Sequence, residues 1–334
     1  MRALSAIKLY HINRDELQEA RAVAEEHLEI ARQAGDPVQQ ASAHAGLGDV
    51  LINMGEFAMG RENIEKAISI LAAPASDEGR SGYTSLQLLG LQVYSAHRAP
   101  ESLWFLGFPD QARRRSKETL VRAHGAEPLI LAHALTQAAY MHADFRDPAA
   151  VRNRIERLSA IIDRYGLHPQ FLEHANELQG RALLLEGRCR EAVEALRNVP
   201  QAKMFLAQAY AAAGDAARAL ETADAALARL YGSQYRAHES SAHQLRGEVL
   251  LLQAEPCPEE AEHCFRTAVE IARRQSAKSL ELRATMSLAR LLAKQGRRAE
   301  ARAMLAEIYG WFSEGFDTAD LKDAKALLDE LNNE

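Results

Sequence analysis

The chain has 334 residues, a formal net charge of −6 and an isoelectric point near 6.1. Because no overall basic charge would concentrate it on nucleic acid, we expect no direct nucleic-acid binding. No apolar run approaches the ~18 residues needed to span a bilayer, so we expect no membrane segment. The cysteines, Cys189, Cys257 and Cys264, are odd in number and lack the spacing of a disulfide framework. This cysteine usage is typical of a reducing compartment and predicts a cytoplasmic protein.

The first predicted helical hairpin comprises residues 3–11 and 15–34. Asp15 is expected to be the acidic N-cap of its second helix. Leu4, Ile7 and Leu9 leave apolar surface that no preceding repeat covers. One hypothesis is that this hairpin pairs between chains in a self-associating scaffold.

The next two hairpins are predicted at residues 38–71 and 83–125. Between them, residues 73–82 are rich in small and turn-forming residues and predict a flexible loop. The hairpin at 83–125 is irregular because Pro100 lies inside a predicted helix, where its ring removes a hydrogen bond and clashes with the preceding turn. We expect a kink or a break near Arg98 or Ala99.

Five further hairpins follow, at residues 127–165, 169–199, 200–230, 235–275 and 277–309. Gly187 and Gly214 are closer together than the ~34 residues of a regular repeat, so the hairpin at 169–199 is predicted to be shortened by about two turns. A C-terminal cap is predicted at 310–334, with Asp317 or Thr318 capping a final helix to Leu331.

Small residues recur at matching positions along these hairpins. A glycine closes the first helix at Gly55, Gly107, Gly187, Gly214 and Gly296, and five residues later stand Gly60, Ala112, Ala192, Ala219 and Ala301. Gly48, Gly180 and Gly247 occupy another shared position inside the first helices. This pattern, with apolar residues at helical spacing, is the tetratricopeptide (TPR) signature. The sequence therefore predicts an all-α fold: a right-handed α-solenoid of about eight TPR-like hairpins, forming a single domain over residues 1–334.

The first helices of such a solenoid line a continuous concave face. Counting back from the turns, the side chains predicted on this groove are Tyr94, His97, Glu101, Trp104, His133, Thr136, Tyr140, His174, Glu177, Arg181, Leu184, Gln201, Gln208, Gln244, Glu248, Arg283 and Arg290. Aromatic and imidazole groups in its middle are typical of the anchors in peptide or small-ligand sites. The alternative is that Trp104 and Tyr94 fill the core between repeats.

The sequence contains only weak matches to catalytic or metal-binding motifs. His238 and His243 flank a near match to the H-E-x-x-H zinc motif, but a spacing of five places them about 140° apart on a helix. Cys257, His263 and Cys264 lack an evident fourth ligand, so we predict no metal site, no cofactor and no enzyme. The run from Arg113 to Arg115 is interpreted as a solvated face.

The segment CFRTAVEIARRQSAKSLELRATMSLARLLAKQGRRAEARAMLAEIYGWFSEGFDTADLKDAKALLDEL resembles the C-terminal TPR region of bacterial signalling proteins. In these proteins an adenylate/guanylate cyclase or a transcriptional-regulator domain precedes a STAND-type ATPase and then the array. WFLGFPDQARRRSKETL, at residues 104–120, resembles the central repeat of the same family. The resemblance implies a sensor or partner-binding arm that recognises a protein, a peptide or a small effector. The alternative is a detached C-terminal fragment of a cyclase or an ATPase-type regulator.

Overall fold

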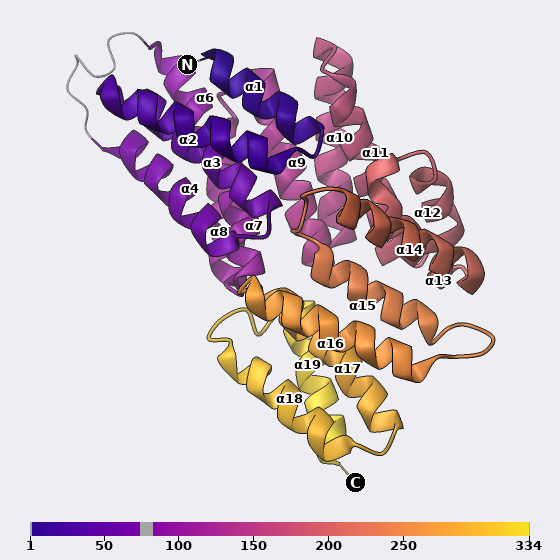
Figure 1. Ribbon diagram of the computed structural model, residues 1–334. Coiled ribbons are helices and arrows are strands. Elements are labelled where there is room, and N and C mark those ends of the chain that lie inside the picture. Colours follow the sequence, from indigo (N-terminus) through magenta and orange to yellow (C-terminus); the bar gives the residue numbers. More distant parts are fainter. Residues whose placement is uncertain (1, 74–82, 334) are drawn as a thin grey trace.

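The structure is a computed structural model that describes residues 2–73 and 83–333. Within these ranges the regular secondary structure is helical, and each helix packs against the next along the chain (Figure 1). The predicted all-α array of stacked hairpins is therefore confirmed. The predicted loop at 73–82 lies, except for Ala73, outside the described residues.

The helices follow one another with short turns. The N-terminal half contains α1 (Arg2–Asn13), α2 (Leu17–Gln33), α3 (Pro37–Asn53), α4 (Phe57–Ala72), α6 (Ser85–Ala96), α7 (Ala99–Phe105), α8 (Pro109–Ala123), α9 (Pro128–Asp144) and α10 (Pro148–Tyr165). The C-terminal half contains α11 (Pro169–Leu185), α12 (Cys189–Leu196), the 3-10 turn η1 (Pro200–Ala202), α13 (Lys203–Ala212), α14 (Ala216–Gly232), α15 (Glu239–Leu250), α16 (Pro258–Arg274), α17 (Lys278–Lys294), α18 (Arg298–Trp311) and α19 (Ala319–Asn332).

The turn glycines adopt the left-handed backbone conformation that L side chains rarely take. Their φ angles are 77° for Gly55, 87° for Gly107, 74° for Gly187, 87° for Gly214 and 82° for Gly296. The alanines five residues after the later four turns are fully buried, as the close approach of two antiparallel helices requires. Where α9 meets α10 no glycine is present, and Arg146 takes the left-handed conformation with φ 62°.

Glycines inside the first helices mark the closest helix contacts. A β-carbon on Gly48 would lie 2.7 Å from Ile64 Cγ1, and one on Gly247 would lie 2.6 Å from Phe265 Cε1. These separations are far below the ~3.5–4.0 Å of normal carbon contact. The recurrence of glycine at this position therefore has a packing cause.

Pro100 breaks the first helix of the third hairpin. α6 ends at Ala96, and α7 begins at Ala99 with the proline in its first turn, where no backbone N–H is needed. This agrees with the expected break near Arg98. The break also turns the backbone at His97 and Arg98, two residues whose side chains line a cavity.

Two other local expectations concern the shortened hairpin and the final helix. α12 has only eight residues, and Pro200 opens the 3-10 turn that follows it. Thr318 caps α19, accepting a hydrogen bond from the Leu321 N–H at 3.5 Å. The spacing of the turn glycines was thus a reliable guide to the length of α12.

One local expectation was wrong. Asp15 is not an N-cap: it lies in the turn before α2 with φ 60°, and Glu16 precedes the helix without a side-chain cap. The arginine run lies on a partly exposed helix face, where Arg113 Nη1 lies 2.8 Å from Asp317 and Arg115 Nη2 lies 3.0 Å from Glu65. Tertiary neighbours far along the chain supply these partners, so no local pattern could show them.

The C-terminal helices pack back against the N-terminal half. The Ser279 hydroxyl donates to the Trp104 carbonyl at 2.5 Å, and Arg283 Nη2 donates to the Asp144 carbonyl at 2.6 Å. Arg146 Nη1 lies 2.5 Å from Asp323 on α19. These contacts join α7 and α9 to α17 and α19. Helices α10–α14 lie on the side of the molecule opposite α2 and α4 (Figure 1).

A second connection joins α3 to the segment before α15. The Asn53 carbonyl accepts hydrogen bonds from the backbone N–H groups of Arg236, at 2.8 Å, and Ala237, at 3.2 Å. Gln275 Nε2 donates to the Arg236 carbonyl at 2.8 Å. Residues 233–238 are therefore held against the N-terminal repeats.

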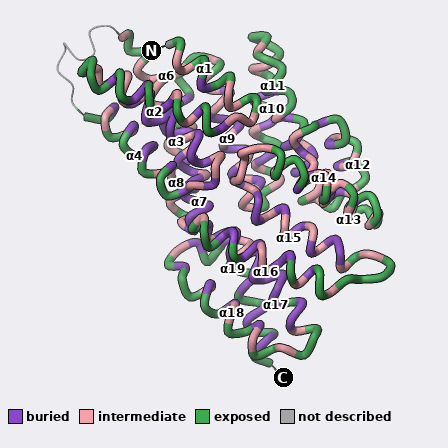
Figure 2. The backbone as a smooth tube through the Cα atoms, in the orientation of Figure 1, coloured by how far each residue is buried: buried purple, intermediate pink, exposed green. Residues whose placement is uncertain are grey.

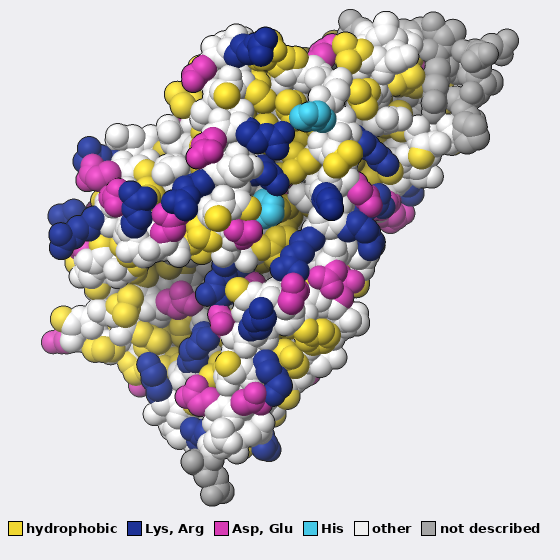
Figure 3. Space-filling model, turned by 180° about the vertical axis from the view of Figure 1, so that it is seen from behind, with side chains coloured by type: hydrophobic (Ala, Val, Ile, Leu, Met, Phe, Trp, Pro, Cys, Tyr) yellow, Lys and Arg dark blue, Asp and Glu magenta, His cyan; other side chains and the backbone are white. Residues whose placement is uncertain are grey.

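Burial follows the helix faces that meet neighbouring helices, while turns and outer faces are exposed (Figure 2). Basic and acidic side chains are interspersed on the face shown in Figure 3, so its described residues present no extended basic surface. On α1, Ile7, Leu9 and Tyr10 are exposed by 43%, 50% and 57%. No helix among the described residues has both the length and the apolar character to cross a bilayer.

Candidate ligand-binding cavity

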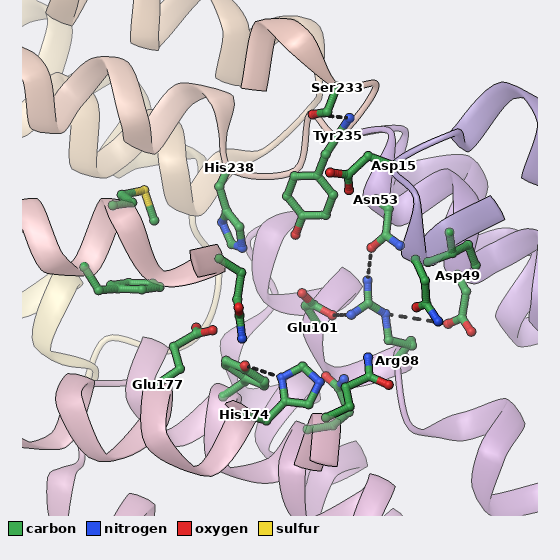
Figure 4. Close-up of a pocket in the computed structure, with 18 of the residues that line it drawn as sticks. Asp15, Asp49, Asn53, Arg98, Glu101, His174, Glu177, Ser233, Tyr235 and His238 are labelled. Carbon is green, nitrogen blue, oxygen red and sulfur yellow. Dashed lines mark hydrogen bonds and ion pairs between the residues drawn. The ribbon is translucent and has the colours of Figure 1, made fainter. Parts of the chain in front are cut away.

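A cavity of about 400 Å³ lies inside the turn of the solenoid (Figure 4). Its wall is built by α1, α3, α6, α7, α9, α11, α13 and α14 together with the segment before α15. Small-molecule sites commonly have volumes of ~300–1,000 Å³. The cavity is thus large enough for a small effector or for part of a peptide.

Two helices supply matching stripes of side chains to this wall. The residues are spaced by four, three and four positions, which keeps them on one helix face: His133, Gln137, Tyr140 and Asp144 on α9, and Gln170, His174, Glu177 and Arg181 on α11. Both helices begin with proline, but the stripe starts five residues after Pro128 on α9 and one residue after Pro169 on α11, so the α11 stripe is shifted by about one turn toward the start of its helix.

The helix break before Pro100 places Arg98 in the cavity wall, where its guanidinium contacts three other side chains. Its Nη1 lies 2.7 Å from Glu101 Oε2, its Nη2 donates to Asn53 Oδ1 at 2.8 Å, and its Nε lies 3.6 Å from Asp49 Oδ1. The Tyr94 hydroxyl donates to Asp49 Oδ2 at 3.2 Å. Burial raises the pKa of Glu101, and the charge of Arg98 offsets only part of that effect.

A second polar cluster lies across the cavity on α9 and α11. The Tyr140 hydroxyl lies 2.8 Å from His174 Nδ1, and the Glu177 carboxyl lies near the same hydroxyl. Burial raises the pKa of Glu177, although Arg181 and the Tyr140 hydroxyl lower it. Glu177 is only 6% exposed, so its carboxyl is held in a poorly solvated place.

Arg181 joins this cluster to α13. Its Nη2 donates to Asp144 Oδ1 at 2.6 Å, and its guanidinium carbon lies 4.3 Å from the centre of the Phe205 ring. A cation over an aromatic face is stabilised electrostatically in addition to its ion pair. The guanidinium is therefore already engaged on two sides.

Four histidines line the cavity, and all of them favour the neutral form. Burial lowers the pKa of His133 and of His238 to about 4, and it also lowers the pKa of His97 and of His174. A neutral imidazole offers one donor and one acceptor. The wall thus combines charged groups with neutral hydrogen-bonding rings, as a site for a polar ligand would.

Part of the predicted groove lies on this wall. The residues that the sequence placed in the groove and that line the cavity are Tyr94, His97, Glu101, His133, Tyr140, His174, Glu177, Arg181 and Gln201. They come from α6, α7, α9, α11 and the turn before α13, and they share one space although they are up to about a third of the chain apart in sequence.

Trp104 and Thr136 were misplaced by the sequence analysis. Trp104 is 3% exposed in a core cluster with Phe105, and Arg283 of α17 covers its ring with a guanidinium carbon 4.7 Å from the ring centre. Thr136 is one position off the α9 stripe, and its hydroxyl donates to the Ala132 carbonyl at 2.9 Å. Trp104 was misplaced because α17 packs over it. Thr136 was misplaced because the predicted helical register was off by one position.

Gln208, Arg283 and Arg290 also lie away from the cavity wall. Arg283 Nη2 lies 2.8 Å from Asp320, so this side chain links α17 to α19. Arg290 is exposed. Beyond α14 the C-terminal helices pack against the N-terminal half, and their first helices no longer face the cavity.

The sequence analysis missed several wall residues. Asp49 and Asn53 come from α3, while Tyr235 and His238 come from the segment before α15. His238 did attract notice, but as part of a zinc motif. His238 lies on the cavity wall. His243 lies elsewhere, with its Nε2 hydrogen-bonded to the Tyr231 hydroxyl at 2.8 Å. No group of three or more potential metal ligands occurs in the described part of the chain.

Fold and site together define an all-helical solenoid of TPR-like hairpins with a partly open cavity lined by polar, aromatic and apolar side chains. The tetratricopeptide repeat family model matches residues 41–70, the hairpin of α3 and α4. A comparison of the sequence with curated proteins finds no match.

Among solved structures, the chain is similar to a Rap protein complexed with Competence and Sporulation Factor, with 13% identity and a TM-score of 0.60 over 99% of this chain and 96% of that one. The apo form of RapI matches at 13% identity and a TM-score of 0.48, over 99% and 97% of the two chains. A STAND protein with a tetratricopeptide repeat sensor from Pyrococcus horikoshii matches at 12% identity and a TM-score of 0.43, over 94% of this chain and 50% of that one. At such identities the likeness to the first shows the fold alone.

Proposed function

We propose that this protein is a non-enzymatic TPR sensor or interaction module that binds a peptide, a protein segment or a small effector in its cavity. The observation that carries the proposal is the cavity wall of buried polar and aromatic side chains contributed by helices from both halves of the chain. Burying charged groups costs stability unless they are fully paired. A binding role accounts for their retention where a purely structural role does not.

The solved Rap structure supports the proposal by analogy, because that protein shares the fold and is complexed with Competence and Sporulation Factor. A role in bacterial cytoplasmic signalling rests on the resemblance of residues 264–331 to sensor arrays that accompany ATPase and output domains. In such a setting, ligand binding would bias a linked domain through different affinities for its states.

The test is a variant that fills the cavity without removing a charge. Gln137 lines the wall from α9, and Gln137→Trp would occupy the space in which a ligand lies. Gln33→Trp, on the exposed surface of α2, is the matched control. A library of short peptides should contain sequences that bind wild type and the control but not the filled variant. Equal binding to all three proteins would refute the cavity as the site.

The alternative from the sequence is that the chain works as the C-terminal part of a cyclase or an ATPase-type regulator. It rests on the sequence resemblance, and it predicts coding sequence for an ATPase next to that of this chain. An unrelated neighbouring sequence would count against it.

Self-association is a second candidate because Ile7, Leu9 and Tyr10 expose apolar surface on α1. Sedimentation at rising concentration tests it, and Leu9→Lys should shift any dimer toward monomer. A monomer throughout the range would remove this candidate.

A further inference from the structure

The charged groups of the cavity wall do not balance. Its acidic residues are Asp15, Asp49, Glu101, Asp144 and Glu177, and its basic residues are Arg98, Arg181, Lys203 and Arg229. The four histidines count as neutral at pH 7 because burial lowers the pKa of each. Five carboxyls thus face four cations, which leaves an excess of one negative charge.

Among the wall's carboxyls, Glu177 is the one that lies outside any ion pair of the described residues, while Arg98 is shared by two carboxyls. The other four carboxyls lie in ion pairs: Asp15 with Arg229, Asp49 and Glu101 with Arg98, and Asp144 with Arg181. Within the described part of the chain, Glu177 makes no ion pair at 4.0 Å or less. Burial raises its pKa, and the charge of Arg181, the nearby Tyr140 hydroxyl and the charge of Arg229 lower it. Glu177 is therefore a buried carboxyl without a counterion.

The surroundings of Glu177 suit a cation. Figure 4 shows Glu101 beside Arg98 and Glu177 set apart from this pair, with Tyr235 and His238 on the segment before α15. The charges of Glu101 and Glu177 both help to raise the pKa of Tyr235, so this ring lies in the field of the two carboxyls. Carboxylates next to aromatic rings are the usual partners of ammonium and guanidinium groups.

An anionic ligand would meet a worse environment. Arg98 is engaged by Glu101, Asp49 and Asn53, and Arg181 is engaged by Asp144 and the Phe205 ring. A ligand carboxylate at Arg98 or Arg181 would have to displace these partners and leave them buried without a counterion, which is costly. Lys203 makes no ion pair among the described residues, but its side chain is half-exposed, so water screens its charge. A ligand cation could bind next to Glu177 without displacing any ion pair.

We propose that the cavity binds a short peptide that carries a single positive charge, an ammonium or a guanidinium, which lies against Glu177. This inference rests on the proposed function and adds the charge and the position of the recognised group. The cavity volume of about 400 Å³ limits the bound part of the peptide to a few residues.

The experiment selects binding sequences from a library of short peptides and then compares each with a version whose cation is neutralised, by N-acetylation or by replacing Lys or Arg with Gln. Wild type should bind the cationic version about thirtyfold or more tightly than the neutral one. The variant Glu177→Gln should lose most of this preference. Glu194→Gln, on the exposed surface of α12, is the matched control and should keep it.

Peptides that bind wild type equally well with and without the cation, or that require an acidic residue, would overturn the inference and leave the proposed function intact. No binding by any peptide would instead refute peptide recognition itself. A measurement without ligand separates a folding defect from a binding defect: replacing the unpaired buried carboxyl should raise the thermal midpoint of Glu177→Gln above that of wild type. A lower midpoint would show that Glu177 is a structural group.

Discussion

Gly180 tests whether the recurring glycines exist for helix packing. In an open helix position, Gly→Ala stabilises by ~1 kcal/mol, because alanine has the higher helix propensity. At Gly180, a β-carbon would lie 2.9 Å from Leu196 Cδ1 and closer still to Cγ and Cδ2. Leu196 is fully buried against Val199, Ala202 and Ala209, so it has little room to move away.

Forcing an extra carbon into a packed core costs about 1–3 kcal/mol. With three Leu196 atoms inside the normal contact distance, we expect a cost near the upper end. After the propensity gain, Gly180→Ala should lower the free energy of unfolding by ~2 kcal/mol. Gly310→Ala is the matched control: this glycine is also helical, and nothing lies within 4 Å of its added β-carbon. It should be neutral or stabilising by up to ~1 kcal/mol.

Urea unfolding followed by far-ultraviolet circular dichroism measures both variants. A Gly180→Ala protein as stable as wild type would refute the packing argument. The double variant with Leu196→Ala gives a stricter test. Leu196→Ala alone should cost ~2–5 kcal/mol. If the two side chains compete for one space, the double variant should be more stable than the sum of the single effects by ~1 kcal/mol or more.

Two predictions concern the cavity wall. Arg98→Met leaves the carboxyls of Asp49 and Glu101 buried without their cation, so it should cost ~3–5 kcal/mol. Unfolding experiments should show a smaller loss at pH 5 than at pH 8, because burial raises the pKa of Glu101 and a protonated Glu101 needs no cationic partner, and a pH-independent loss would contradict the network. His238 has a folded pKa of about 4, below the ~6.5 of an unfolded histidine. The unfolded chain therefore binds more protons in this window, and stability is lost as the pH falls from 6.5 to 4, by up to ~3 kcal/mol for this group. His238→Asn should lose less stability than wild type between pH 7 and pH 4.5, and an identical loss would show that His238 is solvated.

The sequence predicted local features well because their causes are local. The left-handed turn at Gly214 favours glycine, and Pro100 cannot lie in the interior of an uninterrupted helix. The close contacts of Gly48 and Gly247 also lie within one hairpin. For such features the partners lie in the same hairpin, at most 18 residues away, and the repeat supplies their register.

The cavity was predicted only in part because its shape depends on contacts between distant repeats. His174 and Glu177 were found because α11 is regular, whereas Trp104 was misplaced because α17 covers it. Nothing near Trp104 in the sequence indicates that Ser279 hydrogen-bonds its carbonyl. Tyr235 lies outside any helix, so the counting of helical positions could not reach it.

The position of Glu177 suggests how occupancy could reach the rest of the molecule. Glu177 lies on α11, Glu101 lies on α7, and Tyr235 lies on the segment held against Asn53 of α3. A cation between these groups would contact the N-terminal half, the middle and the start of the C-terminal half together. Such a ligand can shift an equilibrium only by as much as its affinities for two arrangements differ. Because Glu101, Glu177 and Tyr235 line one cavity only where α7, α11 and the segment before α15 converge, the ligand should favour the arrangement in this structure over any in which those elements lie apart.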